Sequence, residues 1–224
     1  MPNINKEGKD YVVGDIHGKF RSLMQILLMM DFDFKKDRLF SVGDLCDRGE
    51  HSDDVLEWMK FPWFIPVIGN HETLILGYVQ KLINHDTLIR VGAEWWFKIE
   101  EEKQAKIIHY FENLPIGIEL DSKMGKIGIV HASCPNNSWE SFKIGLKTEE
   151  GSKYAHKAIW TYFKSENKVR IEGVDYLVVG HTTVSEYRQC ENVHLIDTGA
   201  TYQTGYFTIL DLDTLTPVDY QNMD

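Results

Sequence analysis

Five positions along the sequence carry carboxylate, imidazole or amide side chains, which are common ligands of divalent metal ions. Four are glycine-containing segments: Gly14-Asp15-Ile16-His17-Gly18, Gly43-Asp44-Leu45-Cys46-Asp47-Arg48-Gly49, Gly69-Asn70-His71-Glu72 and Gly180-His181-Thr182. The fifth is His131, which follows the apolar run 127–130. Each position comes directly after an apolar run of the kind that forms a β-strand. This pattern predicts a metal centre assembled from the ends of several strands.

The spacing and types of these side chains favour particular metals. Asp15 and His17 are two residues apart, so in an extended chain both side chains reach the same side. Asp44 carries a carboxylate whose two oxygens can bridge two ions. The other candidate ligands supply one amide oxygen and two ring nitrogens: Asn70, His131 and His181. Mixed oxygen and nitrogen ligands suit manganese, iron or zinc better than calcium or a thiolate-bound ion.

Strands and helices alternate along the chain in a way that positions these ligands. Apolar runs predict strands over residues 11–13, 39–42, 64–68, 117–120, 127–130, 176–179, 194–196 and 206–210. Helical spacing predicts helices over 20–30, over 53–59 with Ser52 as N-cap, over 73 to 111 with a break near Gly92, and over 151–164. We expect an α/β domain with a mixed sheet, whose site lies beyond the carboxyl ends of strands.

Bulk properties narrow the class of protein. The length of 224 residues fits one domain spanning residues 1–224. The net charge of −10 argues against extended nucleic-acid binding, because a phosphate backbone would be repelled. The sequence has no apolar run of about 18 residues, so we expect no membrane span, and its polar start is unlike a signal peptide. Three widely spaced cysteines make a disulfide framework improbable and favour the reducing cytoplasm.

The order of the motifs resembles the phosphoprotein phosphatase family of metallophosphoesterases. The resemblance rests on the first three glycine-containing segments, and it spans residues 14 to 200. Three further segments resemble the small bacterial and phage branch, typified by the lambda phage serine/threonine phosphatase: His131-Ala132-Ser133, Gly180-His181-Thr182 and Asp197-Thr198-Gly199-Ala200. The resemblance implies the calcineurin-like fold, in which two mixed β-sheets form a sandwich flanked by helices.

The resemblance also implies a role for each candidate residue. The first metal ion is expected at Asp15, His17 and Asp44, and the second at Asp44, Asn70, His131 and His181. Both would be divalent ions, with Mn²⁺ expected and iron or zinc as alternatives. The expected catalytic residues are His71 as general acid, Asp47 as the carboxylate that orients it, and Arg48 as the phosphate clamp.

These roles predict a two-metal phosphomonoesterase, a serine/threonine protein phosphatase that hydrolyses phosphate esters by attack of a metal-bound hydroxide. The expected partner is a phosphoprotein or a phosphorylated small molecule, with neither nucleic acid nor membrane involved. The sequence leaves the oligomeric state open, with a monomer as the simplest form. Two alternatives remain open. One is a symmetrical diadenosine tetraphosphatase, which shares the metal motifs, and the other is a non-catalytic metal-binding interaction module.

The sequence departs from the branch at one important position. Tyr162 occupies the place of a second phosphate-binding arginine, and either Lys164 or Arg170 is a candidate substitute. The aromatic segment 92–97 is interpreted as a packed cluster, with a role in lining the approach to the site as the alternative. Cys46 and Cys134 adjoin candidate ligands, and we expect inert buried thiols there rather than a redox switch.

Overall fold

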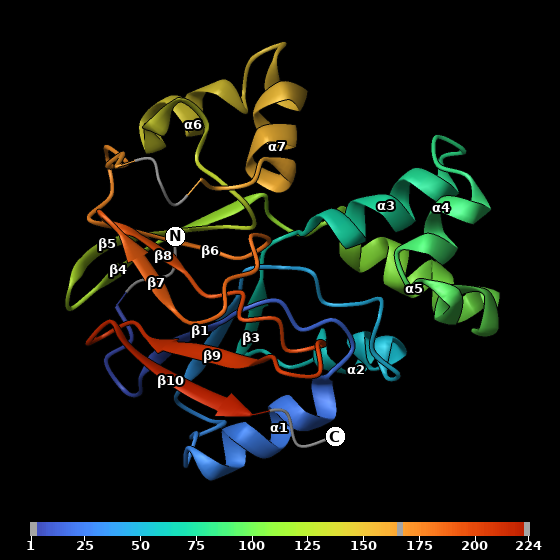
Figure 1. Cartoon of the computed structure of the whole chain (residues 1–224), viewed down its shortest axis with the longest axis horizontal. Helices are drawn as coiled ribbons and strands as arrows, with labels where there is room; N and C mark the ends of the chain where they lie inside the picture. The colour runs from blue at the N-terminus through green and yellow to red at the C-terminus, as the bar shows by residue number, and fades with distance from the viewer. Residues whose placement is uncertain (1–3, 165–167, 222–224) are drawn as a thin grey trace.

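Two five-stranded β-sheets pack face to face in the computed structural model, which describes residues 4–164 and 168–221 (Figure 1). The first sheet has the order β10-β9-β1-β2-β3, with β1 Asp10–Val13, β2 Arg38–Ser41, β3 Phe64–Pro66, β9 Tyr206–Asp211 and β10 Thr216–Gln221. The second has the order β4-β5-β6-β8-β7, with β4 Gly117–Ser122, β5 Gly125–Val130, β6 Tyr176–Val179, β7 Arg188–Cys190 and β8 Val193–Leu195.

Both sheets are mixed, which confirms the expected architecture. In the first, β1, β2 and β3 run parallel while β9 and β10 are antiparallel additions. In the second, β5, β6 and β8 run parallel, with the antiparallel strands β4 and β7 at the edges. Six parallel strands therefore end at the carboxyl edges of the two sheets, where sites of α/β proteins gather.

Helices cover the outer face of each sheet (Figure 1). The first sheet packs against α1 Phe20–Met29, α2 Val55–Trp58, α3 Asn70–Val79, α4 His85–Arg90 and α5 Glu101–Glu112. The second packs against α6 Trp139–Gly145 and α7 Gly151–Trp160. Short 3₁₀ segments lie at Ser52–Asp54, Glu94–Lys98 and Pro135–Asn137. Within the described residues, no helix combines the length and apolar composition required to traverse a bilayer.

Side-chain alternation explains how one short strand serves two apolar layers. Val12 of β1 packs into the cluster between the sheets, while Tyr11 and Val13 pack on the helix-covered side. Neighbouring residues of a strand face opposite sides, so both faces of β1 can be buried at once. The first motif therefore starts from a strand that is held rigidly on both sides.

The eight predicted strands are all present, whereas β7, β10 and α6 were not predicted, and three helix predictions needed correction. The helix predicted over 73–111 begins at Asn70 and is also interrupted over 80–84. The helix predicted over 151–164 ends at Trp160, and the Phe163 N–H donates to the Thr182 hydroxyl at 2.9 Å instead of continuing the helix. Ser52 is not an N-cap, because its hydroxyl donates to the Gly49 carbonyl at 2.9 Å from inside a 3₁₀ turn. The break near Gly92 is confirmed.

The Glu119 carboxylate joins α6 to the second sheet, and this gives a stability prediction. It accepts Trp139 Nε1 at 2.5 Å and Lys143 Nζ at 2.6 Å, and Lys126 Nζ lies 3.3 Å away. Burial alone would raise the pKa of Glu119, but these donors outweigh it and lower that pKa. Since the pKa is lower in the folded state, the stabilisation is present above the unfolded pKa of about 4.3 and is lost as pH falls through the folded value.

We therefore expect Glu119→Gln to lower the free energy of unfolding by about 1–3 kcal/mol at pH 7, the usual cost of a hydrogen bond to a charged group. The difference from wild type should shrink as pH falls below about 4. Urea unfolding at several pH values measures this, with the exposed Glu112→Gln as matched control. Equal stability of the two variants at pH 7 would contradict the prediction.

Candidate metal centre

The six candidate metal ligands all lie beyond the carboxyl ends of strands. Asp15 and His17 follow β1, Asp44 follows β2, Asn70 is the first residue of α3 after β3, His131 follows β5 and His181 follows β6. All six are at most partly exposed, and five are buried. The structure thus brings together ligands from both sheets, including pairs more than 100 residues apart in sequence.

Sharp turns point these side chains inward. Backbone φ is positive at His17 (47°), Asp44 (50°), Asp47 (71°), Arg48 (68°) and His181 (61°). Left-handed backbone costs a non-glycine residue about 1–3 kcal/mol, so the surrounding contacts must maintain it. Such strain tends to occur at functional sites.

The turns also pack closely against each other. At Gly43, where φ is 96°, an added Cβ would lie 2.6 Å from the Gly69 nitrogen. Only glycine allows this approach, which sets the Asp44 turn beside the start of α3.

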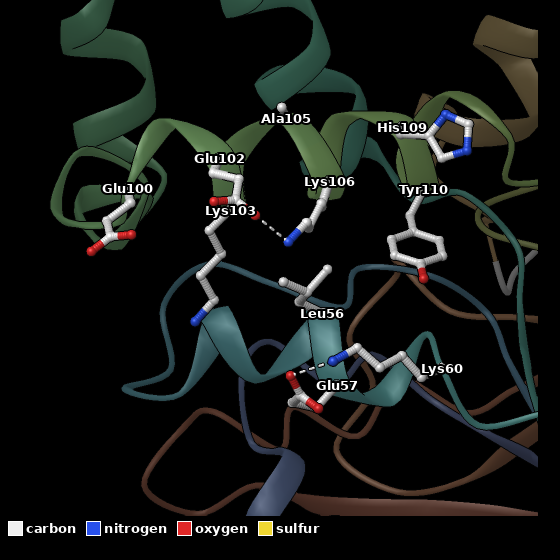
Figure 2. Close-up of a pocket in the computed structure, with 10 residues that line it drawn as sticks. All are labelled: Leu56, Glu57, Lys60, Glu100, Glu102, Lys103, Ala105, Lys106, His109 and Tyr110. Atoms are coloured by element: carbon white, nitrogen blue, oxygen red, sulfur yellow. Dashed lines mark hydrogen bonds and ion pairs between the residues drawn. The ribbon is translucent and has the colours of Figure 1, made fainter.

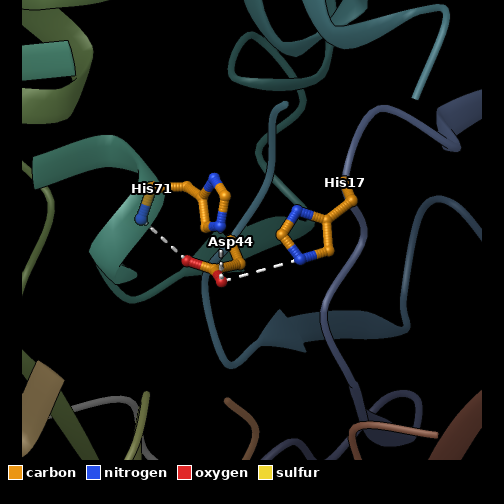
Figure 3. Close-up of side chains that lie close together, drawn as sticks. All are labelled: His17, Asp44 and His71. Carbon is orange, nitrogen blue, oxygen red and sulfur yellow. Dashed lines mark hydrogen bonds and ion pairs between the residues drawn. The ribbon is translucent and has the colours of Figure 1, made fainter. Parts of the chain in front are cut away.

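Asp44 lies at the middle of the centre and faces imidazoles on both sides. Its Oδ2 lies 3.7 Å from His17 Nε2 and 3.9 Å from His71 Nε2. Its Oδ1 lies 3.3 Å from His131 Nε2. Figure 3 shows His17 and His71 directed toward the same carboxylate. One carboxylate is therefore shared by two groups of possible ligands, namely His17, Asp44 and His71, and Asp44, His131 and His181.

The second group is completed by the amide oxygen of Asn70. Its Oδ1 lies 2.9 Å from His131 Nε2 and 2.9 Å from His181 Nδ1. Burial, and then the neighbouring His131, lower the pKa of His181 to about 4. A neutral His181 ring offers a lone pair to a cation. The donor set of two nitrogens and two oxygens suits a divalent ion of the Mn, Fe or Zn type.

Backbone carbonyls fix which nitrogens face the centre. His131 Nδ1 lies 2.8 Å from the Val42 carbonyl, and His17 Nδ1 lies 2.9 Å from the Cys46 carbonyl. A carbonyl only accepts, so each Nδ1 carries the proton and each neutral ring directs an Nε2 lone pair inward. The His131 Nε2 faces the carboxylate of Asp44 and the amide oxygen of Asn70, and the His17 Nε2 faces Asp44 and the guanidinium of Arg48. A cation between these nitrogen and oxygen atoms would be bound by all of them, so the residues fit a divalent ion.

The pKa shifts point to the same need for positive charge. Burial lowers the pKa of His17 to about 3. Burial, then Asp197 and Asp44, raise the pKa of Asp15 well above its usual range. Burial would also lower the pKa of His131, but Asp44 outweighs it and raises that pKa. A cation beside Asp15 and Asp44 would offset the repulsion between their carboxylates. It would also supply the positive charge that the Asp44 carboxylate favours at His131.

Asp15 is held differently from the other ligands. Both of its oxygens lie 3.2 Å from the His181 backbone nitrogen, and its side chain is buried. In the described residues, His71 rather than Asp15 completes the tight cluster around His17 and Asp44. Asp15 therefore belongs to neither of the two tight groups of possible ligands among the described residues.

The three expected catalytic residues are adjacent to this centre. His71 Nδ1 lies 2.7 Å from Asp47 Oδ2, and Asp47 is fully buried. Burial would lower the pKa of His71, but Asp44 and the bond to Asp47 outweigh it and raise that pKa. Arg48 places one guanidinium nitrogen 2.9 Å from His17 Nε2 and another 3.0 Å from His71 Nε2.

Two buried acids near the centre were not identified from the sequence. Glu72 accepts the backbone N–H groups of Gly69 at 2.8 Å, Asp44 at 3.0 Å and Leu45 at 2.8 Å, and so joins the turn after β2 to the first turn of α3. Asp197, after β8, accepts the Thr183 hydroxyl at 2.7 Å. The only indication in the sequence was their position inside glycine-containing strand-end segments.

Tyr162 lies directly against the centre. Its ring centroid is 4.5 Å from that of His181, and 65 % of the residue is exposed. Lys164 lines the same pocket of about 280 Å³ as Tyr162, together with Ser133 and Lys157. Arg170 is exposed. Of the two candidate substitutes for the missing arginine, Lys164 is thus the one placed beside Tyr162.

The two cysteines near the ligands are buried, as expected. Cys46 Sγ donates to Glu72 at 3.4 Å, and burial followed by Asp47 raises its pKa well above the usual range. Burial also raises the pKa of Cys134 to about 12. Both groups are therefore protonated thiols at neutral pH, which disfavours reactivity.

A pocket of about 820 Å³ lies away from the metal centre, between α2 and α5 (Figure 2). Each of the three lysines drawn there forms an ion pair: Lys60 with Glu57 at 2.7 Å, Lys103 with Asp53 at 2.6 Å, and Lys106 with Glu102 at 2.6 Å. Among the described residues, the lining of this pocket contributes no group of metal-binding side chains. The chemistry of the chain is concentrated at the strand ends.

Comparison with known proteins shows which family and which relatives this chain is similar to. A family model described as calcineurin-like phosphoesterase matches residues 11–185. Serine/threonine-protein phosphatase 2 of Escherichia coli strain K12 is 31% identical over 198 residues, covering 85% of this chain and 87% of the relative. Serine/threonine-protein phosphatase 1 of Salmonella typhimurium strain LT2 is 33% identical over 198 residues, covering 86% of this chain and 87% of the relative.

A third relative matches a shorter stretch. The symmetrical bis(5'-nucleosyl)-tetraphosphatase of Coxiella burnetii is 45% identical over 71 residues, which is 30% of this chain and 24% of the relative.

Two solved structures share the fold. A serine/threonine phosphatase from Saccharomyces cerevisiae, similar to human PP5, superposes with a TM-score of 0.70 at 15% identity, covering 99% of this chain and 83% of that one. A putative diadenosine tetraphosphatase gives a TM-score of 0.67 at 19% identity, with 100% coverage of both chains.

Proposed function

This chain belongs to the family of calcineurin-like phosphoesterases, and from that premise we propose that it is a serine/threonine protein phosphatase that uses two divalent metal ions. The observation that carries the proposal is the position of Asp44. Its two oxygens face different groups of imidazoles, at 3.3 Å on one side and 3.7 Å on the other. A carboxylate in that position can bridge two ions.

The proposed ligands are those expected from the sequence. Asp15, His17 and Asp44 would hold one ion, and Asp44, Asn70, His131 and His181 the other. When bound, two such ions activate a water molecule and neutralise charge on the phosphoryl group. The nitrogen and oxygen donors favour Mn²⁺, with iron and zinc as alternatives.

The chain's own residues handle the phosphoryl group and the leaving group. Arg48 offers two guanidinium nitrogens, at 2.9 and 3.0 Å from His17 and His71, that can turn to phosphate oxygens. His71 is placed to donate a proton to the departing alkoxide, and its contact with the Asp47 carboxylate favours the protonated ring. Asp47 orients that ring through the 2.7 Å bond to Nδ1.

Local charge explains how an acidic protein can bind phosphate. The chain has a net charge of −10. Two dications would contribute +4 against −2 from Asp15 and Asp44, and Arg48 adds one more positive charge. The field within the site is then attractive even though the overall charge is not.

A phosphoprotein is favoured over a dinucleotide as substrate. The relatives named as protein phosphatases align with about 85% of this chain, whereas the tetraphosphatase relative aligns with 30%. The tetraphosphatase activity remains the second candidate, because the shorter match to that relative is the more identical of the two, at 45%. The three free cysteines fit a cytoplasmic location.

A substrate panel tests this proposal. The protein is loaded with Mn²⁺ and assayed with a phosphoserine peptide, diadenosine tetraphosphate and an aryl phosphate, with a chelator-treated sample as control. We expect metal-dependent turnover of the peptide and the aryl phosphate, with kcat/KM for the dinucleotide at least about tenfold lower, a difference of 1.4 kcal/mol.

Each alternative has its own outcome. Faster turnover of the dinucleotide than of the peptide would overturn the proposed substrate in favour of the tetraphosphatase. Metal binding without turnover of any of the three would favour a non-catalytic module. Repeating the assay with Zn²⁺ and Fe²⁺ identifies the preferred ion.

A further inference from the structure

A buried tryptophan extends the His71–Asp47 pair into a chain of three residues. Trp95 Nε1 donates to Asp47 Oδ1 at 2.7 Å, while the other oxygen of Asp47 lies 2.7 Å from His71 Nδ1. Trp95 is only 9% exposed and Asp47 is fully buried. With both oxygens engaged, the carboxylate has one orientation in which its second oxygen meets the imidazole.

The loop that carries Trp95 also holds the residue next to Asp47. The Arg48 N–H donates to the Gly92 carbonyl at 2.9 Å. At Gly92, where φ is 89°, an added Cβ would lie 2.8 Å from the Arg48 nitrogen. Asp47 and Arg48 both have left-handed backbone, which other contacts must maintain. Residues 92–95 contact both positions, since Trp95 donates to Asp47 and the Gly92 carbonyl accepts from Arg48.

We propose that Trp95 is a positioning residue for proton transfer, acting on His71 through Asp47. This inference rests on the proposed phosphatase function and adds a residue to it. Without the indole N–H, one oxygen of a buried carboxylate loses its donor, and the carboxylate can rotate away from His71. The imidazole then loses the partner that holds its Nδ1 protonated and its Nε2 directed at the leaving group.

The effect should depend on the leaving group. An alkoxide from serine leaves poorly without a proton, whereas nitrophenolate leaves readily without one. Mispositioning of His71 should therefore slow hydrolysis of the phosphoserine peptide. Hydrolysis of nitrophenyl phosphate, an aryl phosphate, should be almost unchanged. Loss of packing alone would slow hydrolysis of both substrates equally, or would lower the stability of the protein without favouring one substrate over the other.

Trp95→Phe tests this proposal because it keeps most of the ring and removes the donor. We expect kcat for the phosphoserine peptide to fall about tenfold, the lower end for a hydrogen bond to a charged group. KM and the nitrophenyl ester rate should change less than twofold. Trp96→Phe is the matched control, since Trp96 is also buried in the same 3₁₀ segment and its ring centroid lies 5.7 Å from that of Trp95.

A double-mutant cycle separates positioning from packing. If Trp95 acts through Asp47, adding Trp95→Phe to Asp47→Asn should cost nothing further in kcat on the peptide. Additive losses, or a tenfold loss on both substrates in the single variant, would overturn the proposal. Thermal unfolding of each variant reports packing separately.

Proton NMR gives a readout that does not require turnover. Asp47→Asn should move the indole N–H resonance of Trp95 and leave that of Trp96 in place, and Trp95→Phe should move the Nδ1–H resonance of His71. If these resonances did not move, the proposed role of Trp95 in positioning His71 through Asp47 would be wrong. A wild-type protein that turns over no ester would contradict the phosphatase proposal, while these resonances would still decide the role of Trp95.

Discussion

Replacing Asp44 by asparagine is expected to reduce kcat for an aryl phosphate by about a thousandfold or more, because loss of a bridging carboxylate removes several kcal/mol of transition-state stabilisation. Among the described residues, Asp44 is the acid shared by both groups of imidazoles, at 3.3 Å from His131 and 3.7 Å from His17. A neutral amide has one fewer anionic oxygen to share. Both ions should therefore bind more weakly, and not only one of them.

Metal content and thermal unfolding supply readouts independent of activity. Ions that bind only the folded state raise its stability by about 2.7 kcal/mol at a concentration one hundred times Kd. We expect Mn²⁺ to raise the unfolding temperature of the wild-type protein and to have little effect on Asp44→Asn. Elemental analysis should find two ions per wild-type chain.

The matched control is Asp121→Asn, which makes the same chemical change at an exposed position of β4. It should retain wild-type activity, metal content and the Mn²⁺-induced shift. If Asp44→Asn also retained two ions and normal turnover, the bridging role of Asp44 would have to be abandoned. Loss of activity with full metal content would move the role of Asp44 from metal binding to orientation.

The second large effect is expected at His71. His71→Asn should lower kcat for the phosphoserine peptide by about 10²–10⁴-fold, the usual contribution of a general acid. The nitrophenyl ester should be slowed far less, because its leaving group departs without a proton. The geometry behind this expectation is the bond of His71 Nδ1 to Asp47 at 2.7 Å, which leaves Nε2 as the nitrogen that faces the centre.

Steady-state kinetics over a series of phosphate esters with graded leaving-group pKa measure this effect. A plot of log kcat against leaving-group pKa should be steeper for the variant than for the wild-type protein. His85→Asn is the control, because its side chain is 58% exposed and lies at the start of α4. Equal slowing across the series would count against proton donation and favour a role of His71 in holding the metal cluster with His17 and Asp44.

Local patterns in the sequence were sufficient to find eight of the ten described strands and the side chains at their ends, whereas β7 and β10 were missed. Alternating or continuous apolar runs reflect burial of each short strand, as in residues 11–13, and the glycine beside Asp15, Asp44 and Asn70 reflects a tight turn. The positions of these three residues at strand ends follow from both local properties, and that of His131 follows from its apolar run alone. Their roles as ligands came from resemblance and remain proposals.

Local patterns were less reliable where a helix ends. Residues 161–164 continue the composition of α7, but α7 stops at Trp160 because the Phe163 N–H bonds to Thr182, a residue from the loop after β6. Ser52 looks like a cap, yet its hydroxyl bonds to Gly49. In both cases a contact that local propensity does not encode decided the outcome.

The sequence by itself determined the types of residue available for chemistry and the strand ends at which they lie, because burial and turn formation depend on neighbouring residues. Tertiary structure decided which of them meet. Asp47 and Trp95 are joined at 2.7 Å across 48 positions, and Asn70 and His181 at 2.9 Å across 111. Two sheets and several left-handed turns are needed to bring such groups together, so no local pattern could have predicted these contacts.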